Sequence, residues 1–599
     1  MKTLFAIVMT LGLLAGAAFG QPTITQVSNA ASQALPPLQN SSIAQGSYFS
    51  IYGNGLAADI STCGANYANC LWPPTYPLPT SVQDTSVKVT VNGTTVDAYI
   101  EFAAQITSTL AQVNAVLPSN TPTGNGTLTV TYKGSTSSPY PVGVVSNSFG
   151  TFAINQAGTG PGIITDANYN VLTPFHTAKP GDYVILWGTG LGPVDASTEG
   201  SAPPTQTNLC GSGDTCPVTV WVANEKAFVA YAGRAAYTAE DEIVFIVPSD
   251  VSGCYVQVSV QIGSVVGNFT SMAVDPNGAA CQDADGINYA DIQSAVTSNG
   301  KVSVNVLDLL SNYLNLEILG APFQWDNDTV SGEIGTFTTA VLDEFQGFAL
   351  VPSVNNCTVS PFLEYPPPVD PALGLVTYLD AGSQLSITGP QGTQTVPHNT
   401  NGKGYGAIVG GASIADLLSG GGINPFFLNA SGWGTSSWQY QIVPGNYSVS
   451  GPGGADVGAF NATITVPSGD SSFSWNQSSF SSAPISRNTP LTITWTGGDP
   501  NGFVDITAIG STLASGLTPS ATTPGILVEC IAPTSTGHFT IPTYVLQTLP
   551  NTTASTAATP PGELLVGPAS GATKLTAPSG TSVTYVIYHF IGGINVGWQ

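Results

Sequence analysis

Two stretches of the chain alternate apolar and polar residues in nearly the same wording. One reads YFSIYGNGL from Tyr48, and the other reads YVILWGTGL from Tyr183. A period of two that ends in a Gly turn is typical of a strand that enters a loop. We therefore predict that one strand occurs twice, in two copies of the same unit.

The similarity continues along each copy. A loop bounded by two cysteines follows, and then paired strands, VKVTVNGTTVDAYIEFA in the first copy and VTVWVANEKAFVAYAG in the second. A strand that runs to Pro118 or to Pro248 and a closing strand pair complete the copies. About seven short strands in somewhat over 100 residues is the size of an immunoglobulin-like (Ig-like) β-sandwich.

These patterns predict an all-β, multi-domain protein with tandem Ig-like β-sandwiches followed by a further β-sandwich region. We place Ig-like domains at 21–155 and 156–280, a β-rich domain of unknown type at 281–480, and a C-terminal β-sandwich domain at 481–599. Strands such as PLTITWTGG and TSVTYVIYHF indicate the last of these. The Gly-rich turn GTGLGP has no helix after it, so we interpret it as turn chemistry, not as a phosphate site.

Composition and charge narrow the choice of partners. The chain carries a net charge of −25, with only ten Lys and Arg among 599 residues. A nucleic-acid partner needs a basic surface, so we exclude it. Residues 1–20 have the basic start, apolar core and small-residue cleavage site of a signal peptide. We expect a secreted protein, extracellular, at the cell surface or in the periplasm, with no membrane span after signal cleavage.

The eight cysteines suit an exported protein. Local pairing is the simplest arrangement, although sequence alone leaves the connectivity open. The candidate disulfide residues are Cys63 with Cys70, Cys210 with Cys216, Cys254 with Cys281, and the remaining Cys357 and Cys530. Metal binding is the alternative, but no C-x-x-C motif occurs and no His lies near these cysteines.

A calcium site is one hypothesis for the stretch DADGINYADIQSAV. It brings Asp283, Asp285, Asn288 and Asp291 close together in the sequence, as calcium loops do with their oxygen ligands. The spacing departs from a full loop, because position one would be Cys281 and the last acid falls one residue short. The following VNVLDLLSNYL could be a partial second repeat of such a unit. The alternative is an acidic linker with no cofactor.

Two further hypotheses concern sugar chemistry. Trp433 and Trp438 could stack on a glycan, or they could be core aromatics of a sandwich. A carbohydrate-active hydrolase with its site in 320–480 would need two carboxylates, and the densest acidic stretch holds Asp326, Asp328, Glu333, Asp343 and Glu344. We identify no catalytic residue, because none of the four histidines lies in a known motif and G-x-S-x-G is absent.

The two copies also resemble a known family. WGTGLGPV, AFVAYAG and the strand to Pro248, with YGNGL and QVNAVLP in the first copy, resemble the Solibacter-type uncharacterised C-terminal domain of exported acidobacterial proteins. That domain is similar to IPT/TIG Ig-like modules. The resemblance covers about residues 22–275, and LTITWTGGDPNGFVDI resembles the tail of similar proteins. It implies an Ig-like fold and no assigned catalytic residues.

We therefore expect a non-enzymatic structural or binding protein that recognises a glycan or another extracellular protein by surface loops. A hydrolase and a calcium-dependent adhesion or assembly protein are the alternatives.

Overall fold

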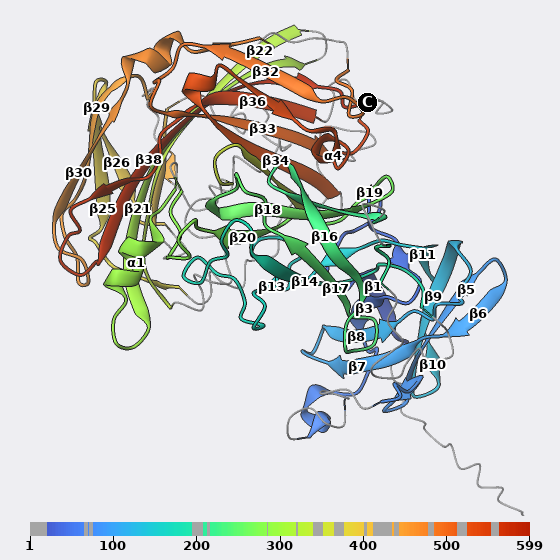
Figure 1. Cartoon of the computed structure of the whole chain (residues 1–599). Coiled ribbons are helices and arrows are strands. Elements are labelled where there is room, and N and C mark those ends of the chain that lie inside the picture. The colour runs from blue at the N-terminus through green and yellow to red at the C-terminus, as the bar shows by residue number, and fades with distance from the viewer. Residues whose placement is uncertain are drawn as a thin grey trace, which may run out of the picture.

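The computed structural model describes residues 21–64, 70, 76–194, 208–211, 216–283, 286–318, 321–338, 352–363, 376–399, 404–410, 434–435, 442–476, 484–511, 524–552 and 562–599. Within these ranges the chain is built almost wholly of β-strands, which confirms the all-β prediction. Figure 1 shows two smaller β-sandwiches in succession, in blue and green, and a larger β-rich unit in yellow to red beside them.

The first sandwich packs two sheets face to face. Their strand orders are β1–β3–β8–β7 and β2–β11–β9–β5–β4, and β6 and β10 pair with β5 and β9. An A-B-E-D sheet that faces a G-F-C sheet is the Ig-like order. The strands are β1 (Thr23–Asn29), β2 (Ile43–Ala44), β3 (Tyr48–Asn54), β4 (Ser81–Val82), β5 (Thr85–Val91), β6 (Thr94–Asp97), β7 (Tyr99–Gln105), β8 (Ala111–Val116), β9 (Gly124–Tyr132), β10 (Ser135–Thr136) and β11 (Tyr140–Val145).

The second sandwich has the corresponding strands in the same order, which confirms the tandem prediction, but β16 pairs with both β17 and β15 and so joins its two halves into one sheet. Its order is β12–β14–β17–β16–β15–β18–β19, with β13 paired to β14 and β20 to β18. β14 occupies the place of β3, so the two similar stretches are the same strand. The strands are β12 (Gly150–Thr151), β13 (Ile164–Thr165), β14 (Tyr183–Thr189), β15 (Val218–Val222), β16 (Glu225–Arg234), β17 (Asp241–Ile246), β18 (Gly253–Ile262), β19 (Val265–Val266) and β20 (Thr270–Val274).

Strand alternation builds the core of each sandwich. In β14, Val184 and Leu186 are buried in the core of the second sandwich, together with Phe245 of β17. Tyr183 on the same strand is exposed and points the other way. Successive side chains of a strand face opposite sides, so alternate residues of β14 supply the apolar contacts of this core.

The larger unit, which we call the C-terminal unit (301–599), is built on a long mixed sheet. Its order is β23–β34–β33–β36–β38–β21–β22–β27–β28, with β24 paired to β22 and β37 to β38. β38 runs parallel to β21 and antiparallel to β36. The strands are β21 (Lys301–Ile318), β22 (Ala321–Thr338), β23 (Asn356–Leu363), β24 (Thr377–Tyr378), β27 (Tyr405–Gly410), β28 (Gly434–Thr435), β33 (Phe503–Ser511), β34 (Pro524–Pro533), β36 (Gly562–Ala569), β37 (Thr573–Leu575) and β38 (Val583–Val596).

This sheet corrects the sequence-based division of the second half. It takes strands from both 281–480 and 481–599, so the two domains placed there share one sheet. The long-range pairing of β21 with β38 leaves no trace in local sequence patterns. The stretch VNVLDLLSNYL lies within β21 and is not a second calcium-type repeat. A short helix, α1 (Tyr289–Ala295), precedes this strand.

Two smaller sheets pack on the long sheet. One has the order β26–β25–β29–β30, and its Leu385, Tyr447 and Ile464 share a core with Leu307 and Tyr588 of the long sheet. The other has the order β31–β32–β35 and shares a separate core near β33 and β34. The strands are β25 (Gln384–Gly389), β26 (Gly392–Pro397), β29 (Gly445–Gly451), β30 (Phe460–Val466), β31 (Ser474–Trp475), β32 (Leu491–Thr496) and β35 (His538–Ile541); helix α4 spans Thr543–Leu546.

The second sandwich contacts both of its neighbours through buried groups. At the junction with the first sandwich, Arg234 is buried, forms an ion pair with Asp241 and donates to the backbone oxygens of Gly46 (2.6 Å) and Gly192 (2.9 Å). Toward the C-terminal unit, the Tyr544 ring of α4 stacks on Trp221 with centroids 4.2 Å apart. These contacts hold the three parts to one another.

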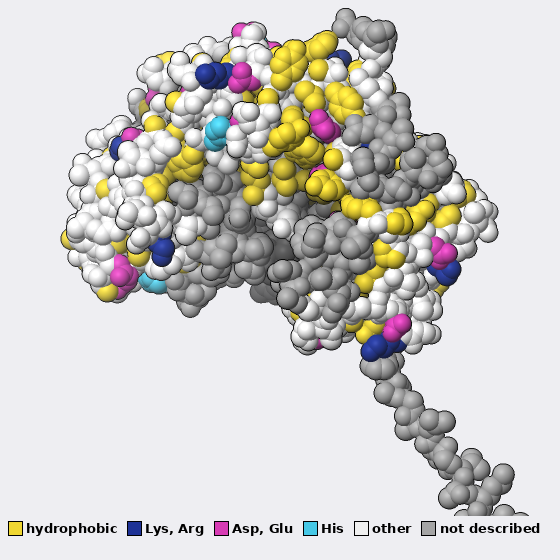
Figure 2. Space-filling view, turned by 60° about the horizontal axis from the view of Figure 1, so that its bottom comes forward, with side chains coloured by type: hydrophobic (Ala, Val, Ile, Leu, Met, Phe, Trp, Pro, Cys, Tyr) yellow, Lys and Arg dark blue, Asp and Glu magenta, His cyan; other side chains and the backbone are white. Residues whose placement is uncertain are grey.

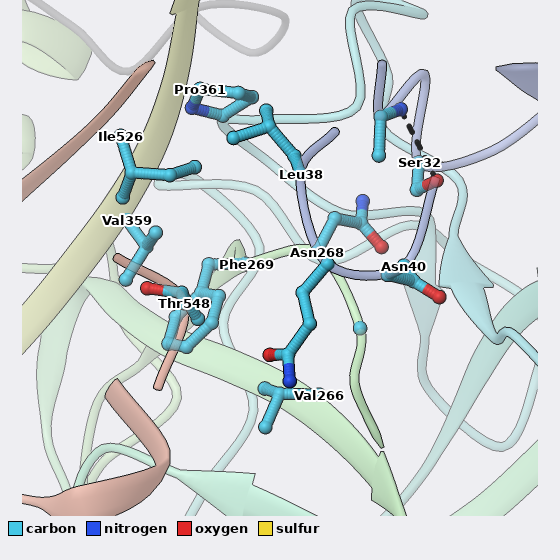
Figure 3. Close-up of a pocket in the computed structure, with 13 residues that line it drawn as sticks. Ser32, Leu38, Asn40, Val266, Asn268, Phe269, Val359, Pro361, Ile526 and Thr548 are labelled. Carbon is cyan, nitrogen blue, oxygen red and sulfur yellow. Dashed lines mark hydrogen bonds between the residues drawn. The ribbon is translucent and has the colours of Figure 1, made fainter. Parts of the chain in front are cut away.

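A small cavity marks the place where all three parts meet. Figure 3 shows Leu38 and Asn40 from the first sandwich, Phe269 from the second, and Val359 and Ile526 from the C-terminal unit around it. Its volume of about 40 Å³ could hold a few water molecules but no larger ligand. We therefore regard it as a packing gap within the junction and not as a ligand pocket.

Candidate functional site

All eight cysteines lie in the described residues and form disulfides. Cys63 is bonded to Cys70, Cys210 to Cys216, Cys254 to Cys281, and Cys357 to Cys530. The last pair joins residues that lie directly opposite each other in β23 and β34. The disulfides close loops, link β18 to the segment that follows the second sandwich, and fasten an outer strand of the long sheet.

The predicted calcium ligands have other partners where the structure describes them. Asp283 is buried and accepts the Cys254 N–H at 2.9 Å. Asn288 caps α1 by accepting the Ala290 N–H, and Asp291 pairs with Lys574 at 2.8 Å. Asp285 lies outside the described residues. Calcium binding here stays a prediction.

Burial raises the pKa of Asp283 to about 6, although its hydrogen bonds to Cys254 and Ser353 act in the opposite direction. Among the described residues, no group of three or more His, Cys, Asp and Glu side chains is arranged to hold a metal ion.

The residues proposed for sugar chemistry are not brought together in the described structure. Trp433, Trp438, Asp343 and Glu344 lie outside the described residues. Asp328 is buried on β22 and accepts the Ile442 N–H at 2.7 Å, which makes it a structural acceptor.

A cluster of charges on the long sheet was not foreseen. His589 of β38 lies with its Nδ1 3.5 Å from Oδ2 of Asp505 on β33. Burial lowers the pKa of His589, but the hydrogen bond to Asp505 and the charges of Asp308, Asp505 and Glu529 outweigh it and raise the pKa to about 9. Burial, and then the charge of Asp505, raise the pKa of Glu529 to about 8. Only the strand pairing brings these residues together, so no sequence motif marks them.

An exposed apolar surface lies on the outer side of the second sandwich. In β14, β17 and β16, Tyr183, Ile246 and Phe228 are aligned in one cross-strand row. Ile185, Val244 and Tyr231 form the next row, in which Ile185 is buried. Paired residues of a sheet point to the same side, so both rows face outward. Tyr183 is 54% exposed and Phe228 is 55% exposed.

Trp187 and Tyr169 extend this surface at one end. Their ring centroids are 6.0 Å apart, and Tyr169 is 66% exposed. The indole N–H of Trp187 donates to Oγ1 of Thr165 at 3.2 Å, which fixes the plane of the ring. We call Tyr169, Tyr183, Trp187, Phe228 and Tyr231 the aromatic face.

Charge is sparse on this surface. Glu242 pairs with Trp187 in the sheet, and burial raises the pKa of its carboxyl. Figure 2 shows the same tendency over one side of the molecule, where apolar side chains gather in patches and charged ones are scattered singly or in pairs. Such a surface can stack on flat, uncharged ligands but offers little to a charged one.

A groove of about 420 Å³ on the C-terminal unit is a second hollow of interest. Phe473 and Trp475 line it on one side, and Phe590 and the small residues Gly592 and Gly593 of β38 line it on another. Ser471 and Asp470 add polar atoms, but Asp470 already accepts the Tyr588 hydroxyl at 2.9 Å and the Asp499 N–H at 2.9 Å.

Comparisons with known proteins add only distant likenesses. No protein-family model matches the chain, and no curated protein is similar to it. Solved structures that resemble it include the tandem Ig domains of titin, at 7% identity over 39% of this chain and 91% of that one, with a TM-score of 0.12. Domains 1–6 of the surface layer protein SbsC match at 11% identity over 97% of this chain and 55% of that one, with a TM-score of 0.16.

A glucan-utilization protein of Bacteroides ovatus, SGBP-B in complex with a mixed-linkage heptasaccharide, matches at 12% identity over 88% of this chain and 92% of that one, with a TM-score of 0.12. At these TM-scores the likenesses carry no functional weight, and the Ig-like fold is established by the strand orders above. Among the described residues, no helix is long and apolar enough to cross a membrane.

Proposed function

We propose that this chain is an exported, non-enzymatic binding protein that uses the aromatic face to bind the flat surface of a neutral polysaccharide. The observation that carries the proposal is the exposure of Tyr169, Tyr183 and Phe228 on one side of a rigid sheet. The apolar faces of sugar rings stack on aromatic rings. Tyr183 of β14 and Phe228 of β16 are separated by Ile246 of β17, and rings spaced across three strands match a polymer better than a small molecule.

The surrounding architecture supports this role. The second sandwich is held on both sides by the buried contacts of Arg234 and Tyr544, so the aromatic face is presented by a scaffold that need not reorganise on binding. The disulfides suit an oxidising compartment outside the cytosol. We further propose that both sandwiches are IPT/TIG-type modules, supported by the motifs of β3 and β14.

A neutral glycan fits this surface better than a charged partner. The chain has 35 acidic residues against ten Lys and Arg, and Glu242 is paired with Trp187 at one end of the aromatic face. A protein partner with an apolar surface is the competing occupant. No cofactor is required for stacking, so the proposal includes none.

The test is sedimentation of the purified protein with insoluble cellulose and with chitin. We expect Tyr183→Ala/Phe228→Ala to bind roughly five- to 150-fold more weakly, because each of the two stacked rings contributes roughly 0.5–1.5 kcal/mol. Leu110→Ala, at another exposed apolar site on the first sandwich, is the control and should bind normally.

Unchanged binding by the double variant would refute the aromatic face as the site. The other outcome is that the wild type binds neither polymer and captures a protein partner that the double variant does not capture. That result would identify a protein, not a glycan, as the ligand of the aromatic face.

A further inference from the structure

The junction between the two sandwiches contains a pair of carboxyl groups in apolar surroundings. Glu101 lies on β7 of the first sandwich, and Glu240 immediately precedes β17 of the second. Around them, Tyr48, Val116 and Ala239 form a buried apolar cluster that joins the two sandwiches. The nearest buried cation, Arg234, is already bound to Asp241 and to two backbone oxygens.

The local backbone directs Glu101 to this place. The register of β7 against β8 shifts between Ile100 and Phe102, so Glu101 is the extra residue of a β-bulge. A bulge turns a side chain away from its regular alternation. The Glu101 carboxyl is hydrogen-bonded to the Tyr48 side chain.

The carboxyl group of Glu240 has fewer hydrogen-bond partners than its chemistry allows. Its Oε2 atom is buried and has no hydrogen-bond partner in the described part of the chain. The preceding turn is nevertheless fixed across the junction, because Oγ1 of Thr189 donates to the Ala239 oxygen at 2.6 Å and accepts the Tyr48 N–H at 2.9 Å. An ionised carboxylate without a partner is costly in such a site, whereas a neutral carboxyl is tolerated.

We propose that this junction is a pH-sensitive joint, which is tight while Glu101 and Glu240 are protonated and loosens when both ionise. The ionisable groups that face the pair supply no compensating free cation. They are Tyr48, Tyr76, Tyr237, Asp241 and Glu242, with Arg234 held by Asp241.

The titration of the two acids supports the direction of the effect. Burial raises the pKa of Glu101 to about 7, although its hydrogen bond to Tyr48 acts in the opposite direction. Burial, and then the charges of Asp241 and Glu242, raise the pKa of Glu240 to about 7. Because both values lie above the usual 4.5 of an exposed glutamate, the stabilisation of the joint is complete below about pH 4.5 and is lost as the pH rises through 7. A closed joint is therefore favoured by acid, and neutral to alkaline pH favours opening.

The experiment is hydrogen exchange by mass spectrometry on the full chain between pH 5.5 and 8.0, corrected for the intrinsic exchange rate at each pH. Peptides that cover β3 and the turn before β17 should lose protection roughly twenty-fold per carboxyl over this range, if opening exposes the group fully. Peptides from β5 and β9, away from the junction, should keep theirs.

The variants distinguish the joint from a general effect of pH. Glu101→Gln/Glu240→Gln should make the junction peptides insensitive to pH, and Glu225→Gln, an exposed acid on β16, should behave as wild type. If the double variant does not fold, Glu240→Gln alone replaces the carboxyl that has the unpartnered oxygen. It should remove about half of the change in the logarithm of the protection factor, because one of the two titrating carboxyls is gone. A wild-type junction with constant protection, or a Glu240→Gln variant with the full wild-type loss, would overturn the proposal.

Discussion

Removal of the Cys357–Cys530 disulfide should cost the C-terminal unit more stability than removal of any other disulfide costs the part of the chain that contains it. The bond joins residues 173 positions apart, whereas Cys210–Cys216 spans six. A cross-link stabilises mainly by restricting the unfolded chain, and its effect grows with the logarithm of the loop length. That relation gives roughly 5 kcal/mol for the long loop and roughly 2 kcal/mol for the short one.

The assay compares Cys357→Ala/Cys530→Ala with Cys210→Ala/Cys216→Ala. Native-state hydrogen exchange in increasing urea measures the free energy of unfolding from the amides of β34 for the first variant and of β15 for the second. Local measurement is needed because a chain of several parts need not unfold in one step. Both variants replace paired cysteines by alanine, so the lost sulfur contacts are similar in kind.

One result would contradict the prediction for the long disulfide. Equal losses in the two variants, or a smaller loss at β34 than at β15, would show that loop entropy does not govern these bonds. Native-state strain or residual structure in the unfolded chain would then have to explain the result.

Three further predictions concern the described structure. The C-terminal unit should lose stability as pH rises from about 6.5 through 9, because the stabilisation from a group with a raised pKa such as His589 is complete below its ordinary pKa and is lost above the shifted one. The melting temperature of His589→Gln should therefore depend less on pH over that range than the melting temperature of the wild type. A stronger pH dependence in the variant would contradict this. Gly567→Ala should give little soluble protein, because the added Cβ would collide with the Phe590 backbone oxygen. Normal expression with an unchanged melting temperature would refute the close approach of β36 and β38. Millimolar calcium should raise the melting temperature by less than about 2 °C, since Asp283 and Asp291 already have partners in the fold. A larger rise that Asp283→Asn abolishes would contradict this and support the calcium site.

The sequence predicted the parts of the fold that depend on local alternation. β3 and β14 could be matched because each carries its inward residues at every second position and ends in a glycine turn. Three disulfides could be paired from their short loops, and Cys357 and Cys530 were then the two cysteines left.

The charged cluster and the shared sheet lay beyond this kind of reasoning. Asp505 and His589 come together only because β33, β36 and β38 pair, and that pairing depends on the whole unit. The aromatic face was also missed, although its signal was present. Tyr183 and Trp187 occupy the outward positions of β14, where a soluble sandwich usually carries polar residues.

The position of β38 has a consequence for the order of events during synthesis. This strand lies between β21 and β36, yet it is made after nearly all the rest of the chain. The β21–β22 hairpin therefore leaves the ribosome with one long edge open, and at 5–20 residues per second its partner follows roughly 13 to 53 seconds later. Open edges invite pairing with other chains during that interval. A chaperone or the export machinery would have its greatest effect on this protein by shielding residues 301–318 until residues 583–596 arrive.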